Sequence, residues 1–169
     1  NMLASATKAL VDQDEDLANE VILRDDIADE MDLNIEHMCM RLLALQQPLA
    51  KDLRTIGTAL KIITDLERIG DYSVDIARVA KSLLGEPYFK PLEDIPRMSE
   101  IVTSMVRDAL RSFATRDMDL VRQVCEKDQQ VDDIWHALKE ELIGRMEQDP
   151  KLIRQATALL LTARYLERI

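Results

Sequence analysis

Apolar residues recur at steps of three and four along most of the chain, which is the spacing of one face of an α-helix. In the first half this pattern covers residues 17–45 and 53–84, and a Gln-Pro pair at 47–48 marks a turn between them. The pattern resumes at Ile95, and an Asp-Pro pair at 149–150 marks the matching turn before a last helix. The pattern therefore predicts long helices joined by short turns.

Breaks in the pattern divide the chain into two similar parts. Residues 85–91 contain one Gly and two Pro and are expected to form a linker. Shorter breaks at 12–16 and 115–119 separate a leading helix in each part, so that each part has three helices. We therefore expect a first bundle over residues 1–84 and a second bundle over residues 92–169.

The two parts are related in sequence, which indicates an internal duplication. A shift of 103 residues places Asp14 on Asp117, Leu17 on Leu120, Val21 on Val124, Asp25 on Asp128 and Asp29 on Asp132. After the turn, a shift of 100 places Leu66-Glu67-Arg68-Ile69 on Leu166-Glu167-Arg168-Ile169. The sequence thus predicts an all-α fold of two pseudo-repeated three-helix bundles.

The repeat also suggests that the last helix is truncated. Its counterpart in the first half continues to Leu84, whereas the final helix stops in mid-pattern at Ile169. The leading helix of the second half can begin near Leu92, but its counterpart has almost nothing before Met2. We therefore expect residues to be missing at both ends.

Composition supports a helical protein and narrows the class of partner. The 169 residues include only four Gly and 4% aromatic side chains but 47% hydrophobic ones, which disfavours β-sandwich and Rossmann folds. A net charge of −10 disfavours binding to nucleic acid or to an anionic lipid surface. No apolar stretch is long enough to span a bilayer, so a cytoplasmic location is expected.

Carboxylates occur in the helix seams where apolar residues are expected. In the first half, Glu67 lies in the seam of the third helix with Asp71 one turn later, and Asp25 and Asp29 are spaced in the same way on the second helix. In the second half, Asp128 and Asp132 repeat one pair, and Glu167 repeats the start of the other. The residue that would pair with Glu167 lies beyond Ile169.

These carboxylates need neutralisation, because gathering ionised groups in a seam is costly. Basic residues that lie nearby in sequence are one answer, namely Arg54, Arg68, Arg154 and Arg168. Hard cations are the other, because helical bundles build oxygen-rich metal sites from carboxylate pairs on adjacent helices. An acidic pair alone is a weak signal, but duplicated pairs in seam phase favour metal.

Other polar and sulfur-containing residues suggest no further chemistry. His37 and His136 lack the ExxH spacing of ferritin-like di-iron sites, and no nucleophile motif or phosphate-binding loop occurs. The cysteines and methionines are expected to pack in the core, because they lie at helical spacing among apolar neighbours. These residues are Cys39, Cys125, Met31, Met38, Met40 and Met146.

Two segments of the first half resemble a known family. Residues 65–71, Asp-Leu-Glu-Arg-Ile-Gly-Asp, and residues 47–54, Gln-Pro-Leu-Ala-Lys-Asp-Leu-Arg, are similar to the PhoU family of phosphate transport accessory and regulatory proteins. The resemblance implies a pair of three-helix bundles. It also implies a metal ion, possibly in a multinuclear site, with iron, zinc, manganese or magnesium as candidates. The implied ligands are Asp25, Asp29, Glu67, Asp71, Asp128, Asp132 and Glu167.

The resemblance further implies a role in regulating phosphate uptake and the phosphate-starvation response. The implied partners are a sensor histidine kinase and the ATP-binding subunit of an ABC phosphate transporter, with membrane association only through these partners. It also implies a cytoplasmic homodimer that is not an enzyme. Two alternatives remain open from the residues alone: a carboxylate-bridged helical metalloenzyme, and a helical scaffold whose acids bind no metal.

Overall fold

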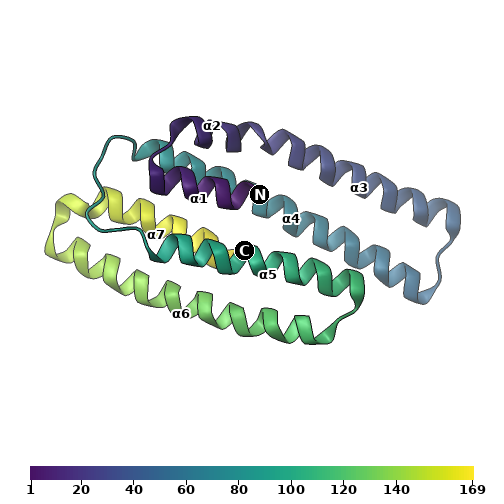
Figure 1. Ribbon diagram of the computed structural model, residues 1–169. Helices are drawn as coiled ribbons and strands as arrows, with labels where there is room; N and C mark the ends of the chain where they lie inside the picture. Colours follow the sequence, from purple (N-terminus) through teal and green to yellow (C-terminus); the bar gives the residue numbers. More distant parts are fainter.

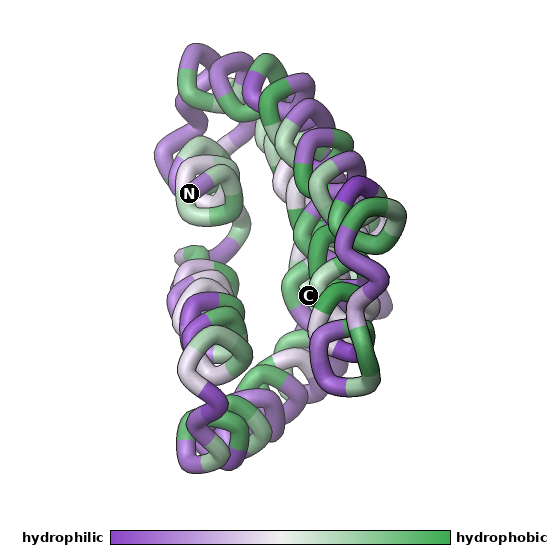
Figure 2. The backbone as a smooth tube through the Cα atoms, turned by 90° about the vertical axis from the view of Figure 1, so that its right-hand side faces the viewer, coloured by the Kyte–Doolittle hydropathy of each residue, from purple (hydrophilic) through white to green (hydrophobic).

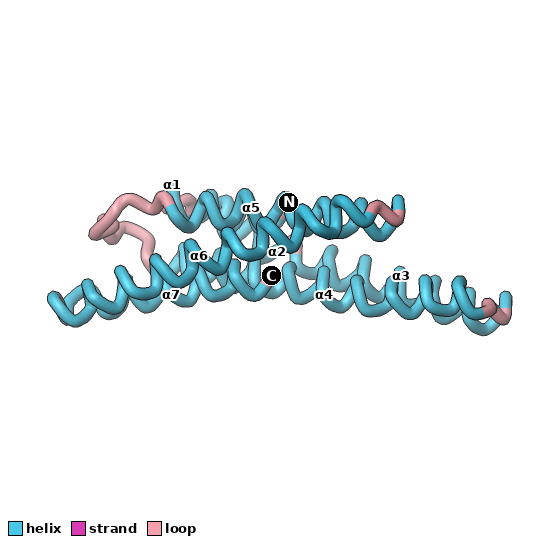
Figure 3. Tube along the Cα trace, turned by 90° about the horizontal axis from the view of Figure 1, so that it is seen from below, coloured by secondary structure: helices cyan, strands magenta, loops and turns pink.

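The computed structural model describes residues 1–169 and contains helices but no strands (Figure 3). The leading elements of each half are α1 (Met2–Asp12) and α5 (Asp94–Thr115). The remaining elements are α2 (Glu15–Leu23), α3 (Asp25–Gln46), α4 (Ala50–Ser82), α6 (Met118–Gln148), a 3₁₀ turn η1 (Pro150–Leu152) and α7 (Ile153–Arg168). The predicted all-α fold and the turns at 47–48 and 149–150 are confirmed.

The corner after the first helix is built in the same way in both halves. Gln13 and Arg116 end α1 and α5 in the left-handed backbone region, at φ of 53° and 59°. The next residues, Asp14 and Asp117, are N-caps whose carboxylates accept backbone N–H groups of the following helix at 2.9 Å. The duplicated Asp is therefore explained by its capping role.

The second helix of the first half differs from its expected form. A single helix was expected from residue 17 to 45, but the helix is divided at Arg24 into α2 and α3. The Arg24 N–H donates to the carbonyl oxygens of both Glu20 and Val21, which tightens the last turn of α2. The counterpart α6 is continuous, so the division is a local departure from the repeat.

The two halves lie side by side and share one apolar core (Figure 1). Helix α1 packs on α5, and α4 packs on α7. At the first contact the Thr7 hydroxyl donates to Ser99 Oγ at 2.9 Å, and both side chains are buried. At the second, the rings of Tyr72 and Tyr165 stack with centroids 5.4 Å apart. Figure 2 shows hydrophobic and hydrophilic residues interleaved along the helices, as expected when each helix has only one packed face.

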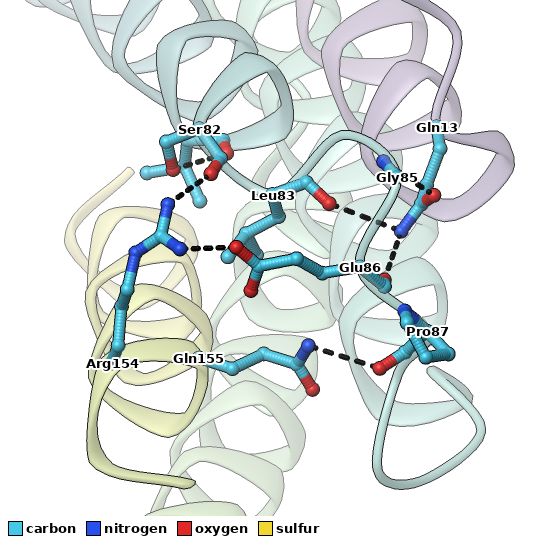
Figure 4. Close-up of polar contacts among 9 residues, drawn as sticks. Gln13, Ser82, Leu83, Gly85, Glu86, Pro87, Arg154 and Gln155 are labelled. Carbon is cyan, nitrogen blue, oxygen red and sulfur yellow. Dashed lines mark hydrogen bonds and ion pairs between the residues drawn. The ribbon is translucent and has the colours of Figure 1, made fainter. Parts of the chain in front are cut away.

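The segment between α4 and α5 is fixed by side chains from both halves (Figure 4). The Gln13 amide donates to the carbonyl oxygens of Leu83 and Glu86 at 3.2 and 2.6 Å. From α7, Gln155 Nε2 donates to the Pro87 carbonyl at 3.2 Å, and Arg154 pairs with the Glu86 carboxylate. These contacts explain how a segment without regular structure keeps a defined path.

Several sulfur-containing residues lie on the surface, contrary to the expected core packing. Met31, Met38 and Met40 on α3 are exposed by 60, 64 and 54%, and Cys125 is also exposed. As expected, Cys39 is buried and Met146 is partly buried against the shared core. For the three methionines, the physical reason is that no third helix covers this part of α3, whereas α5 covers the matching part of α6 with Ile95, Met98 and Val102.

No helix combines the length and the apolar character that crossing a membrane requires.

Candidate functional site

The acidic residues of the first half gather where α3 lies against α4. Asp25 is half-buried at the start of α3, and its Oδ1 lies 3.7 Å from the position that a Cβ on Gly70 would occupy. Glu67, three residues before Gly70, is also half-buried. Asp29 and Asp71 lie one turn further along each helix and are exposed. The structure thus brings the predicted residues of the first half together on one face.

The pKa values of Asp25 and Glu67 are raised at this face. Burial raises the pKa of Asp25, and the charges of Asp29 and Asp71 raise it further. Burial likewise raises the pKa of Glu67, followed by repulsion from Asp71 and Asp29. The mutual influence of acids on α3 and α4 shows that their charges lie close enough to repel.

Asp32 joins this group, although it was not among the predicted site residues. Its Oδ1 atom is buried and has no hydrogen-bond partner, and its charge contributes to raising the pKa of Glu67. The two acids line a pocket of about 180 Å³ between α3 and α4 whose other five lining residues are apolar. The sequence could have identified Asp32, because it lies one turn after Ala28 in the apolar seam that the pattern predicts for this helix.

None of the four arginines that were considered as neutralising partners pairs with these acids. Arg68 pairs with Asp65 at 3.4 Å on the outer side of α4, and Arg154 pairs with Glu86 in the linker segment. Arg54 and Arg168 form no ion pair. Asp25, Asp29, Asp32, Glu67 and Asp71 therefore form no ion pair. The charge of Arg78 lowers the pKa of Asp25, but burial and the neighbouring acids outweigh it.

The donor set restricts which ions could bind at this face. It consists of carboxylate oxygens, and both histidines are exposed, so it suits hard ions such as Mg²⁺ and Mn²⁺ better than ions that prefer nitrogen or sulfur. As the side chains lie, no three His, Cys, Asp or Glu residues come close enough together to hold a metal ion. Binding would therefore require the acids to converge further.

The predicted residues of the second half are arranged differently. Asp128 is exposed and Asp132 is half-buried on α6. Glu167 on α7 accepts an ion-paired hydrogen bond from Arg164 at 2.6 Å. Asp128 and Asp132 form no ion pair, so the second half differs from the first at Glu167, which has a basic partner.

The fold and this face define a duplicated, all-helical protein with paired carboxylates between its helices. The chain matches the PhoU domain over residues 1–80 and 95–169. It belongs to the PhoU family.

Named relatives and solved structures agree with this assignment. The chain is 42% identical to a protein of Clostridium acetobutylicum and 46% identical to one of Aquifex aeolicus, in each case over 96% of this chain and 74% of the relative. Both are named "Phosphate-specific transport system accessory protein PhoU homolog". Such names describe accessory proteins, not enzymes.

The solved structures extend the match to three dimensions. The crystal structure of PhoU from Pseudomonas aeruginosa matches with a TM-score of 0.94 at 36% identity, covering 99% of this chain and 80% of that one. The phosphate transport system regulatory protein PhoU from Streptococcus pneumoniae matches with a TM-score of 0.89 at 30% identity, covering 99% and 78%.

Proposed function

We propose that this protein regulates phosphate uptake and the phosphate-starvation response in the cytoplasm. The observation that carries this proposal is the identity of 42 and 46% to phosphate-specific transport system accessory proteins over 96% of the chain. The proposed partners are the sensor histidine kinase and the ATP-binding subunit of the phosphate transporter, and the proposed assembly is a homodimer. The net charge of −10 favours partner surfaces that carry complementary basic residues.

The partner proposal is tested by affinity capture from the source cells. The tagged 169-residue chain is expressed in phosphate-replete cells, and captured proteins are identified by mass spectrometry. We expect to recover the kinase and the transporter ATPase, in amounts that differ between replete and starved cells. Recovery of neither protein above a tag-only control would contradict the regulatory proposal, and light scattering of the purified chain tests the homodimer.

We also propose that the acidic face of the first half binds a divalent cation. Its support is the group of Asp25, Asp29, Glu67 and Asp71, none of which forms an ion pair. Burial first, and then repulsion within the group, raise the pKa of Asp25 and of Glu67. A bound cation would neutralise these charges and order α3 against α4. Because the donors are oxygens, Mn²⁺ is a suitable probe.

The cation proposal is tested by equilibrium binding of Mn²⁺, followed by the electron paramagnetic resonance signal of the free ion. Glu67→Gln and Asp71→Asn should each weaken binding at least tenfold. Asp52→Asn is the matched control, because Asp52 is an exposed acid in the first turn of the same helix. Equal binding by Glu67→Gln and Asp52→Asn would exclude the proposed site.

A further inference from the structure

Arg164 in the second half lies between an acid and an aromatic ring. Its guanidinium donates to Glu167 Oε2 at 2.6 Å along α7. Its Cζ atom also lies 5.6 Å from the ring centroid of Trp135 on α6, which is only 9% exposed. A guanidinium can bind a carboxylate through its edge while its face lies on an aromatic ring, so one side chain satisfies both neighbours.

The same repeat positions carry different chemistry in the first half. They are occupied by Thr64, Glu67 and Asp32, as the shifts of 100 and 103 residues show. The Thr64 hydroxyl donates to the Leu60 carbonyl of its own helix at 3.2 Å and brings no charge to Glu67. Asp32 places a second carboxylate where the second half has Trp135. The first half thus gathers negative charge at positions where the second half balances it.

We propose that cation binding is confined to the first half, because Arg164 already supplies in the second half the positive charge that a metal ion would otherwise supply. This inference rests on the proposed cation site of the first half. It disagrees with the expectation, drawn from the family resemblance, that Asp128, Asp132 and Glu167 form an equivalent metal site.

The surroundings of Arg164 hold it in this position. The next residue, Tyr165, stacks on Tyr72 of α4 with an interplanar angle of 23°, and Leu166 is fully buried in the shared core. Figure 1 shows α7 lying between α6 and α4, so α7 is in contact with both halves. A cation at Glu167 would share the carboxylate with Arg164, whose charge would repel it, or would compete with Arg164 for Oε2.

Trp135 provides a built-in reporter, because it is the only tryptophan of the chain. Mg²⁺ does not quench fluorescence by itself, so a change in emission on adding Mg²⁺ would mean that the surroundings of Trp135 had changed. We expect no change in emission at Mg²⁺ concentrations that saturate the first half. A shift of the emission maximum with the same midpoint as binding would contradict the proposal.

Matched variants in the two halves test the assignment directly. In Mn²⁺ binding measurements, Glu67→Gln should lose at least tenfold in affinity, whereas Glu167→Gln should stay within twofold of the original chain. Loss of bound Mn²⁺ in Glu167→Gln would overturn the inference. A chain that binds no Mn²⁺ at all would instead refute the proposed cation site of the first half.

Arg164→Thr separates these two failures, because it places the first-half residue in the second half and leaves Trp135 in the core. The variant should acquire Mn²⁺ binding that depends on Glu167, even if the original chain binds none. Its Trp135 emission should then respond to Mg²⁺. No gain of binding in a variant with unchanged helix content would show that Arg164 does not take the place of a cation.

Discussion

Gln13 is expected to stabilise the protein through the linker, and the duplicated corner provides an internal control for this effect. Its amide makes three hydrogen bonds: Nε2 donates to the carbonyls of Leu83 and Glu86, and Oε1 accepts the N–H of Gly85 at 3.3 Å. Gly85 itself adopts φ of 74°, which favours glycine, so the segment has few ways to compensate. The perturbation we consider is Gln13→Gly.

The expected magnitude follows from two opposing terms. Hydrogen bonds of this kind contribute about 1 kcal/mol each, and because this site is only partly buried we expect a loss of about 2 kcal/mol for the three. The left-handed backbone conformation at position 13 costs a residue other than glycine about 1 kcal/mol, and the change to glycine removes this cost. The net destabilisation is therefore about 1 kcal/mol.

Arg116→Gly isolates the side-chain contribution. Arg116 has nearly the same φ, occupies the same corner of the repeat and makes no side-chain hydrogen bond or ion pair. Arg116→Gly should gain the same free energy from removal of the left-handed strain as Gln13→Gly does. The free energies of unfolding of the two variants should therefore differ by about 2 kcal/mol, or about 6 °C in Tm for a chain of this size. Thermal unfolding followed by circular dichroism at 222 nm gives both values. Equal Tm values for the two variants would refute the reasoning.

Four further variants test the core, the linker and the acidic face in urea unfolding experiments. Leu142→Ala removes a fully buried side chain and should cost about 3 kcal/mol, whereas Leu161→Ala, which is 45% exposed, should cost less than about 0.5 kcal/mol. Lys90→Met should cost about 1 kcal/mol at pH 7, because the hydrogen bond from Lys90 lowers the pKa of Glu141, and this cost should vanish as the pH falls through the pKa of Glu141. A difference from the original chain that does not shrink as the pH falls would contradict that linkage. Glu67→Gln should stabilise the chain by about 0.5 kcal/mol at pH 7, because the pKa of Glu67 is raised. The folded protein then binds the Glu67 proton more tightly than the unfolded chain does, so this advantage should shrink as the pH falls and Glu67 becomes protonated; an advantage that grows with acid would show the opposite sign.

The fold could be predicted from sequence because its main signals are local. The spacing of apolar residues defines each helix, and the capping aspartates Asp14 and Asp117 mark the corners through bonds to residues two or three positions away. The division at Arg24 was missed because its neighbours continue the helical pattern on both sides. Exposure of Met31 and Cys125 was missed for a different reason, since periodicity shows which face of a helix is apolar but not whether another helix covers it.

The candidate site could be predicted only in part. The pairs Asp25–Asp29 and Glu67–Asp71 were found because each lies one turn apart on one helix, and the structure places both pairs on one face. Asp32 was missed because periodicity places it in the seam of its own helix but does not show that Glu67 on α4 lines the same pocket. The contact of Arg164 with Trp135 was missed for the same reason, since it joins α7 to α6 across the bundle.

The duplication explains why the two halves can differ at these positions without losing the fold. A buried seam position must be filled or neutralised, and Trp135 fills it with apolar volume, whereas Asp32 occupies it with a charge that finds no partner within the chain. The second solution costs stability, and a cation that binds only the folded state would recover that cost. If the proposed cation site is correct, the stability of the first half should rise with cation concentration, whereas the second half contributes Leu166 and Tyr165 to the packing between the halves. An even distribution of acids between the halves would not separate these two roles.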